Sequence, residues 1–522
     1  MSWTTEQQRA IEARDVDLLV AAAAGSGKTA VLVERILQRI TDPNDAASIY
    51  NLLVVTFTNA AAAEMRKRIA DGLSSRLKHT ADPVLRNQLD TQLTLLSGAA
   101  ISTLHGFCQN LIRQYIHELG WEPNFRLLTD TEALLLKEDV LDLVLESRYE
   151  IGEESFLDLA DSHGGSQDDR ALRELILQLH NLSLSQPWPL HWLSQIGSLL
   201  YIPKEQSFEE TPWAKEILRY AKIVLKDADH LLFSLSEESA RRNRSYGDTF
   251  LNDKAVIDEL QTALDQSWNA FSDQLAHSKF PTASWGVGKN SPSVEIEDKE
   301  FFSSQRDYLK KRIESLKKYF ARSGNDLLDD LKVVAPELKL LAEITIEFYE
   351  AYQKKKIDLG RADFADLEHG ALAILRKEGS TPDKKIEPSA AALELQQRFT
   401  EVLIDEYQDT NGVQEAILSL LCDDCGAWRF QVGDVKQSIY KFRLAEPELF
   451  LQKYLNYPQV PECERVDLAK NFRSRPEILS GINFIFEQLF SLDAAEMVYG
   501  PEEALQAGSD FLAPDATTLA GP

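Results

Sequence analysis

One segment near the N-terminus combines small residues, a lysine and a threonine at a spacing suited to phosphate chemistry. It consists of Ala22, Ala23, Ala24, Gly25, Ser26, Gly27, Lys28 and Thr29. Small residues let backbone N–H groups surround phosphate oxygens at a helix N-terminus, Lys28 can reach the β- and γ-phosphates, and Thr29 offers a hydroxyl to Mg²⁺. The segment therefore predicts a P-loop that binds ATP, with Ala22 in the place where a first glycine is usual.

Two adjacent acids late in the chain complement this segment. Asp405 and Glu406 follow directly on the apolar run 402–404. A P-loop needs carboxylates on a neighbouring strand, and here Asp405 is suited to bind Mg²⁺ while Glu406 is suited to activate the attacking water. Either segment alone could be an ordinary turn. Together they predict a site that hydrolyses ATP with Mg²⁺ as its cofactor.

The elements that must position these segments alternate between strands and helices. Short apolar runs precede helical patterns near the N-terminus and again late in the chain, which is typical of an α/β fold with a doubly wound parallel sheet. The expected strands are 16–20, 52–56, 100–103, 401–404, 429–433 and 464–468. The expected helices are 28–39, 60–73, 107–116 and 476–490.

The spacing between the lysine and the acids indicates an insertion. About 380 residues separate Lys28 from Asp405, far more than one ATP-binding core of ordinary size needs. Segments such as 132–150 and 337–355 carry apolar residues at helical spacing, so a mostly helical domain should be inserted, with 120–336 as the candidate. Probable loops are 162–168 and 279–292, and 500–522 shows no clear element.

Composition limits the classes of function. The 522 residues carry a formal net charge of −27 and are 44% hydrophobic, which excludes a uniformly basic surface for nucleic acid but is ordinary for a globular protein. The apolar runs are too short to span a membrane and residues 1–14 are too polar for a signal peptide, so we expect a cytoplasmic protein with no membrane partner. Cys422 and Cys425 have metal-ligand spacing, but no second pair follows, and ordinary thiols are favoured.

Seven further segments occur in the order typical of one protein family. They are 3–11, 56–65, 102–107, 363–367, 405–410, 432–447 and 471–474. They resemble the motifs of superfamily 1A DNA helicases of the UvrD/Rep type, and more closely those of the AddA subunits of bacterial AddAB helicase-nucleases. Residues 444–447 favour the second comparison, because Leu-Ala-Glu-Pro stands where UvrD-type enzymes usually begin with glycine.

The resemblance implies roles for individual side chains. Gln7 would read the adenine edge and Phe472 would stack on the adenine. Gln437 would sense the γ-phosphate, and Arg473 would reach it as an arginine finger. The residues implied to contact DNA are Phe57, Thr58, Asn59, Thr103, His105, Tyr440, Phe442 and Arg443. The aromatic rings among them suit a contact that tolerates any base sequence.

The resemblance also implies a domain organisation and a partner. Residues 1–119 and 337–455 would form a first RecA-like core around an inserted helical accessory domain at 120–336, and 456–522 would begin a second, truncated core. The implied function is an ATP-dependent 3′→5′ motor on single-stranded and duplex-end DNA. It would act with an AddB-like subunit, as a heterodimer, in double-strand-break repair by homologous recombination. Because the second core would be incomplete, we expect weak ATP binding, poor hydrolysis and no unwinding from this chain alone. Nothing after Arg473 resembles a nuclease carboxylate cluster, so nuclease activity is expected only of the full-length parent.

Two alternative functions remain open. The chain could be a stand-alone UvrD-like helicase, or a fragment that binds nucleotide or DNA without turnover, which ATPase assays with and without single-stranded DNA would separate. A basic segment, residues 310–322, could contact duplex DNA, although a solvated helix face is favoured.

Overall fold

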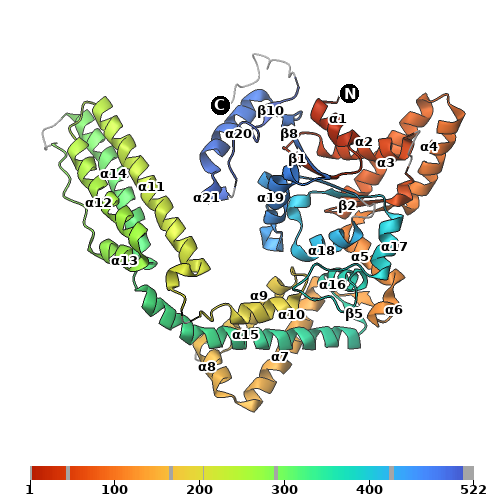
Figure 1. Ribbon diagram of the computed structural model, residues 1–522, viewed down its shortest axis with the longest axis horizontal. Helices are drawn as coiled ribbons and strands as arrows, with labels where there is room; N and C mark the ends of the chain where they lie inside the picture. The colour runs from red at the N-terminus through yellow and green to blue at the C-terminus, as the bar shows by residue number, and fades with distance from the viewer. Residues whose placement is uncertain are drawn as a thin grey trace. The chain divides into compact units, whose positions relative to one another are not determined.

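The computed structural model describes residues 3–42, 47–163, 168–203, 205–286, 292–422, 428–495 and 497–509, and its main feature is a six-stranded parallel sheet (Figure 1). The strand order is β3-β2-β6-β7-β1-β8, with parallel pairing throughout. The strands are β1 (Asp17–Ala22), β2 (Leu52–Thr56), β3 (Ala100–Thr103), β6 (Glu401–Asp405), β7 (Trp428–Gly433) and β8 (Cys463–Leu468). Segments from both ends of the chain therefore share one sheet.

Both faces of this sheet are covered by helices. Successive residues of a strand point to opposite faces, and on β1 Leu18 and Val20 enter one hydrophobic core while Leu19 enters the other. The first core also contains residues of α1 (Thr5–Glu12), α2 (Lys28–Thr41), α3 (Asn59–His79) and α4 (Pro83–Leu95). The second contains residues of α5 (Leu104–Gln114), α16 (Phe364–Leu375), α17 (Ala390–Arg398), α18 (Gly412–Leu421) and α19 (Pro447–Asn456). The predicted α/β class with a doubly wound parallel sheet is confirmed.

Side-chain caps fix where the helices begin. Thr58 accepts a hydrogen bond from the Ala61 amide, so α3 starts at Asn59, and Thr103 accepts one from the Gly106 amide, so α5 starts at Leu104. Helix α5 therefore begins three residues before its predicted start at 107. A short helix, α6 (Ile116–Leu119), follows it.

The last strand corrects one prediction. We expected 464–468 to open a second core, but β8 pairs with β1, with Val466 opposite Val20. The physical reason is burial: β1 is apolar on both faces, and Val466 and Leu468 join the same hydrophobic core as Val20. Strand β8, which we expected to be the first strand of a second core at 456–522, thus belongs to the six-stranded sheet.

Beyond β8, a small separate sheet forms. Strand β9 (Lys470–Asn471) pairs in parallel with β10 (Gln506–Ala507), and α20 (Pro476–Leu489) and α21 (Leu492–Ala495) lie between them in sequence. The expectation that 500–522 holds no element is therefore wrong at β10. Residues 510–522 lie outside the described part of the chain.

The chain divides into two compact units. The larger comprises Met1–Ser194 and Ala342–Pro522, and the smaller comprises Gln195–Leu341. The smaller unit is thus narrower than the inserted domain predicted at 120–336, because residues 120–194 group with the larger unit. These residues include α7 (Asp130–Ile151), α8 (Glu154–His163) and α9 (Arg170–Ser183), and strand β4 (Arg126–Leu127) pairs with β5 (Arg361–Ala362).

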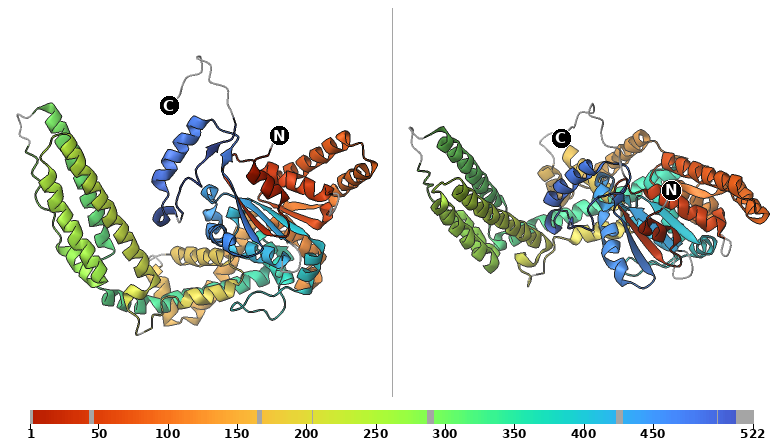
Figure 2. Two further views of the ribbon diagram at one scale, coloured as in Figure 1. Left: turned by 45° about the horizontal axis from the view of Figure 1, so that its top comes forward. Right: turned by 90° about the horizontal axis from the view of Figure 1, so that it is seen from above.

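The smaller unit is built from helices, drawn in yellow-green and green in Figure 2. They are α11 (Pro212–Arg241), α12 (Gly247–Gln266), α13 (Trp268–His277) and α14 (Ser293–Ser315). Their core is aromatic, with Trp268 packed against Phe208 and Phe320. Arg306 is buried there and donates to both carboxylate oxygens of Asp253.

Helix α15 (Gly324–Asp358) crosses a boundary that we predicted between domains, because it continues through Pro336 rather than starting after it. Helix α10 (Pro189–Ser198) instead crosses the division between the two compact units at Ser194. Among the described residues, no helix has both the length and the apolar composition required to span a membrane.

Candidate functional site

Apart from Gln7 on α1, the predicted site residues lie at or after the carboxyl ends of strands in the six-stranded sheet. The P-loop follows β1, Phe57 follows β2, and His105 follows β3. Asp405 ends β6, the segment with Asp434 and Gln437 follows β7, and Asn471 to Arg473 follow β8. Because all six strands are parallel, these segments share one edge of the sheet, the edge at which open α/β sheets bind ligands.

The P-loop has the backbone conformation that a phosphate cradle requires. Gly25 and Gly27 have φ values of +70° and +84°, a region that side chains rarely adopt. A Cβ atom on Gly25 would lie 2.7 Å from Asn471 Nδ2, so this position must be glycine for space as well. The Ser26 hydroxyl is buried and has no hydrogen-bond partner among the described residues. The loop therefore fits a bound anion with unused donors.

The segment after β8 is fastened to this loop. Asn471 Nδ2 donates to the Ala24 carbonyl at 2.6 Å, and the Phe472 amide donates to the Gly25 carbonyl at 2.9 Å. The Asn471 side chain also accepts from the Arg473 amide at 2.8 Å. Arg473 and Phe472 are thus held beside the P-loop within this chain, although their predicted nucleotide contacts stay untested.

The lysine and the acids meet, although we expected the acids on a strand next to that of the P-loop and β7 lies between β1 and β6. Lys28 Nζ lies 3.0 Å from Glu406 Oε2, and its side chain is only 12% exposed. Burial and then the neighbouring Glu406 raise the pKa of Asp405 to about 6, while Lys28 lowers it. Burial and Glu406 likewise raise the pKa of Asp409 to about 6. Carboxylates this close repel one another, and a divalent cation would relieve that repulsion.

A relay of amides joins the acids to the segment after β7. Gln408 Nε2 donates to Glu406 Oε2 at 2.9 Å, and Gln408 Oε1 accepts from the Asp434 amide at 2.9 Å. Asp434 Oδ2 in turn accepts from Gln437 Nε2 at 2.7 Å. The predicted γ-phosphate sensor, Gln437, is therefore linked to the predicted base, Glu406, through Asp434, by its side chain and its backbone amide, and through the side chain of Gln408. Sequence reasoning missed Gln408 and Asp434 as members of this relay.

The side-chain amide of Gln7 is hydrogen-bonded beside the P-loop. Its Nε2 donates to the Ser26 carbonyl at 2.9 Å, and its Oε1 accepts from the Thr4 amide at 3.0 Å as part of a capping box. Each end of the amide thus makes one hydrogen bond in this structure. One N–H hydrogen and one oxygen lone pair are left for the predicted contact with the adenine edge, which stays untested.

Aromatic residues predicted to contact a strand come together from two segments. The rings of Phe57 and Tyr440 are 4.7 Å apart, and those of Tyr440 and Phe442 are 5.8 Å apart. The Arg443 guanidinium lies over both Tyr440 and Phe442. Phe442 is 76% exposed. Exposed rings beside a guanidinium can stack on bases of any identity.

One pocket connects the predicted strand contacts to the acids. It has a volume of about 250 Å³. Its walls include Phe57, Thr103, His105, Asp405, Glu406, Asp409, Gln414, Tyr440 and Arg443. Asn59 instead lines a different pocket, together with Arg66 and Arg398. The structure therefore brings five of the eight predicted strand contacts to this pocket, whereas Thr58, Asn59 and Phe442 do not line it.

Two predicted strand contacts already have a structural role. The hydroxyls of Thr58 and Thr103 cap α3 and α5 by accepting backbone amide hydrogens. We expect Thr103→Ala to lower the free energy of unfolding by about 1 kcal/mol, because an N-cap side chain is lost. Thr103→Ser keeps the acceptor and should restore stability in urea denaturation. If Thr103→Ser lost as much stability as Thr103→Ala, the capping role would be contradicted.

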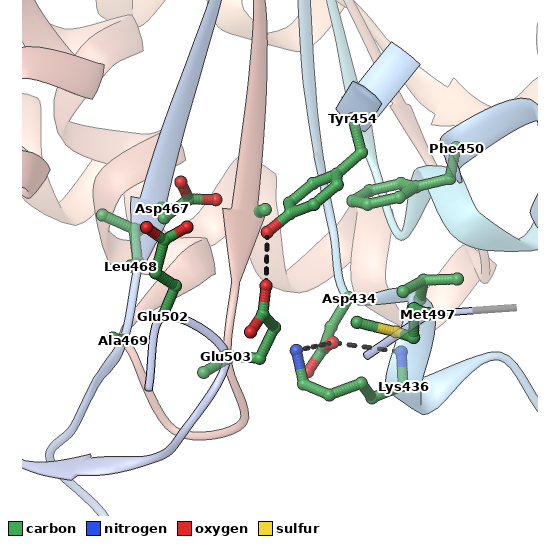
Figure 3. A pocket seen from close by; sticks show the side chains of 13 residues that line it. Asp434, Lys436, Phe450, Tyr454, Asp467, Leu468, Ala469, Met497, Glu502 and Glu503 are labelled. Atoms are coloured by element: carbon green, nitrogen blue, oxygen red, sulfur yellow. Dashed lines mark hydrogen bonds and ion pairs between the residues drawn. The ribbon is translucent and has the colours of Figure 1, made fainter. Parts of the chain in front are cut away.

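A smaller pocket near the P-loop is unsuited to a nucleotide. Figure 3 shows it beyond the ends of β1 and β8, with a volume of about 30 Å³. The Tyr454 hydroxyl donates to Glu503 at 3.2 Å, and Asp467 and Glu502 also line the pocket. Burial raises the pKa of Asp467, and Arg465 lowers it. Four carboxyl groups line this pocket, Asp434 among them, and would repel a triphosphate. The P-loop therefore remains the predicted phosphate site.

Three of the six basic side chains in the basic segment of the smaller unit pair with neighbouring carboxylates. Arg312 pairs with Asp227 at 3.5 Å, and Lys317 pairs with Glu314 at 3.9 Å. Arg322 pairs with Asp330. These contacts favour the solvated helix face over a duplex-binding face. In the described part of the chain, no group of three or more His, Cys, Asp or Glu residues could hold a metal ion, and Cys425 lies outside that part.

Leu444 marks the departure from the usual helicase pattern. It has φ +63° and ψ +24°, a left-handed conformation in which glycine is favoured. The structure therefore explains why UvrD-type enzymes usually carry glycine here. Leu444 keeps the same backbone turn at the cost of some strain.

Comparisons with known proteins agree with this geometry. Residues 3–458 match the family model described as the UvrD/REP helicase N-terminal domain. The chain is also similar to three relatives named as ATP-dependent helicase/nuclease subunits. It is 42% identical to that of Desulforamulus reducens, covering 100% of this chain and 42% of the relative. It is 40% identical to that of Acetivibrio thermocellus (98% and 41%) and 41% identical to that of Oceanobacillus iheyensis (96% and 41%).

The chain thus spans about two fifths of the length of these curated relatives. The match to the helicase family model, in contrast, covers most of the chain, including both halves of the six-stranded sheet. The chain therefore belongs to the UvrD/REP helicase family and carries the N-terminal domain of that family at residues 3–458.

Proposed function

We propose that this chain is the ATP-driven motor part of a helicase-nuclease that moves 3′→5′ along single-stranded DNA. The observation that supports this most is the pocket lined both by Asp405 and Glu406 and by Phe57, Tyr440 and Arg443. A motor must make its grip on a strand depend on the state of its nucleotide. Because the predicted strand contacts and the predicted hydrolytic acids line the same pocket, a change at the nucleotide can act directly on the groups that hold the strand.

In this proposal each part of the nucleotide site has a separate task. The P-loop amides and Lys28 bind the phosphates, and Thr29 with Asp405 holds Mg²⁺. Bound Mg²⁺ neutralises charge on the phosphates. Glu406 takes a proton from the attacking water, and Arg473 stabilises charge that develops at the γ-phosphate. Gln437 reports the γ-phosphate to Glu406 through Asp434 and Gln408.

The wider biological role rests on the relatives. They are named as subunits, which supports the existence of a second protein in the assembly, and for this chain we propose an AddB-like partner in a heterodimer. We also propose duplex-end DNA as the substrate, double-strand-break repair by homologous recombination as the pathway, and the cytoplasm as the location of that DNA. The segment from β9 to β10 would begin the second core, against which the first closes around ATP.

Replacing Phe442 with alanine should weaken binding of single-stranded DNA by about 1–3 kcal/mol, because stacking area is lost. ATP affinity should not change, since Phe442 does not line the P-loop. Fluorescence anisotropy with a labelled oligo(dT) measures the DNA affinity. Phe484→Ala is the matched control, because this ring is 65% exposed and lies on α20. Equal DNA affinity in the Phe442 variant and the parent would rule out the stacking role.

Strand displacement tests the proposed function as a whole. A form of the protein with a complete second core should separate a duplex with a 3′ single-stranded tail in the presence of Mg-ATP, and should leave a 5′-tailed duplex intact. The 522-residue chain should bind oligo(dT) but not unwind either duplex. Unwinding of the 5′-tailed duplex would contradict the polarity, and robust unwinding by this chain would contradict the need for a second core.

A further inference from the structure

A buried glutamate, Glu368, lies beneath the pocket that joins the acids to the strand contacts. It is on α16, which packs against α5 and α18, as Figure 1 shows, and only 6% of its side chain is exposed. Its neighbours Leu367, Ala371 and Leu372 are apolar and buried. A carboxylate at such a position is costly unless polar partners compensate for the lost water.

Two partners provide that compensation: one lies in the predicted motif 102–107, and the other follows the acidic segment 405–410. Glu368 Oε1 lies 3.2 Å from His105 Nε2 and accepts from Gln414 Nε2 at 2.7 Å. His105 is near the start of α5, two residues after the strand contact Thr103. Gln414 is in the first turn of α18, whose cap Asn411 follows the acidic segment 405–410. Both partners line the pocket of about 250 Å³.

These contacts constrain the imidazole of His105. An acceptor at Nε2 keeps a hydrogen on that nitrogen, so in the neutral ring Nδ1 is left as the acceptor. The ring of Phe364 lies edge-on to the imidazole, with centroids 5.6 Å apart, and limits its rotation. Burial raises the pKa of Glu368, and His105 and Gln414 lower it. The carboxylate and the imidazole therefore stabilise each other in one arrangement.

We propose that Glu368 is a positioning residue that sets the orientation of His105 for contact with the DNA strand. The same carboxylate fixes His105 to the first turn of α18, the helix that follows the acidic segment. This inference rests on the proposed function, because it requires that the chain bind single-stranded DNA. None of the sequence motifs gives Glu368 a role.

A double-mutant cycle tests the inference in this chain. Glu368→Gln keeps the size of the side chain and should weaken oligo(dT) binding by about fivefold, the effect of one lost hydrogen bond. Combined with His105→Ala, it should weaken binding no further than His105→Ala alone, because both changes remove the same contact. Combined with Phe442→Ala, its effect should multiply. Glu368→Leu should repeat this pattern if the glutamine variant does not fold.

Two further measurements separate positioning from general damage. In protein with ¹⁵N-labelled histidine, the ¹⁵N chemical shifts of His105 should show a hydrogen on Nε2. Glu368→Gln should move these chemical shifts toward values averaged over the two tautomers. Glu394→Gln is the matched control, because this exposed carboxylate accepts from the Tyr115 hydroxyl at 2.8 Å, away from His105, and its replacement should leave DNA affinity unchanged.

The outcomes distinguish this inference from the proposed function. If the parent chain binds oligo(dT) and the changes at Glu368 and His105 have multiplying effects, the positioning role is overturned and the proposed function is unaffected. If the parent chain does not bind oligo(dT) at all, the proposed function itself fails.

Discussion

Replacing Lys28 with alanine should weaken Mg-ATP binding by about 3 kcal/mol, roughly a hundredfold in dissociation constant. Lys28 is the cation that the P-loop directs at the phosphates, and it is held at the site by Glu406 at 3.0 Å. Without it, the P-loop would have no lysine charge to offset the repulsion between the phosphates and Glu406. Isothermal titration calorimetry on the parent and the variant measures the difference.

The control for this experiment is Lys377→Ala. Lys377 is exposed, with 60% of its side chain in solvent, and pairs with Glu387 away from the P-loop. We expect its ATP affinity to match that of the parent. If Lys28→Ala also matched the parent, the assignment of residues 22–29 to phosphate binding would fail.

Replacing Glu406 with glutamine should preserve ATP binding and slow hydrolysis by at least about a hundredfold, because the amide keeps the shape but cannot take a proton. Glu406 is suited to this role because its side chain is 36% exposed and can meet water. It has φ +53°, an unusual conformation for glutamate that directs the chain away from β6. Phosphate release at saturating ATP and single-stranded DNA measures the effect in a form with a complete second core.

Two results would identify a different base. Hydrolysis at the parent rate in Glu406→Gln would exclude this residue, and a large loss in Asp409→Asn alone would point to Asp409, whose pKa is also raised to about 6. Glu394→Gln is the matched control and should hydrolyse ATP like the parent. A loss of ATP affinity in Glu406→Gln would show that the substitution damages the loop rather than the chemistry.

The strands of the sheet were predictable because their signals are local. An apolar run that ends at a small or acidic residue predicts a buried strand and its end, and β2 and β3 have the predicted bounds. The P-loop was predictable for the same reason, since Gly25, Gly27 and Lys28 are contiguous or nearly so. The prediction that Lys28 and Glu406 meet needed only the rule that parallel strands share a carboxyl edge.

Other features depend on contacts between distant segments and leave no local pattern. The sequence of β8 does not reveal that β1 is its neighbour, so it predicts only a strand that could open a second core. Gln7 could be placed at the nucleotide by resemblance, but its bond to the Ser26 carbonyl depends on how α1 packs. The strongest local signal for Glu368 was an acid on the apolar face of a helix. The same pattern would arise if the buried face of the helix were assigned wrongly from the sequence.

The strand order also determines when the phosphate loop can form. Strand β1 lies between β7 and β8, and the bonded residues Asp17 and Arg429 are 412 positions apart in the chain. Asn471, which closes the loop through Ala24, is 447 positions from it. A ribosome adding about 5–20 residues per second needs roughly 22–90 seconds to cover that distance. During synthesis, β1 therefore stays without either neighbour for tens of seconds, and the first functional segment to be translated is among the last to reach its native structure.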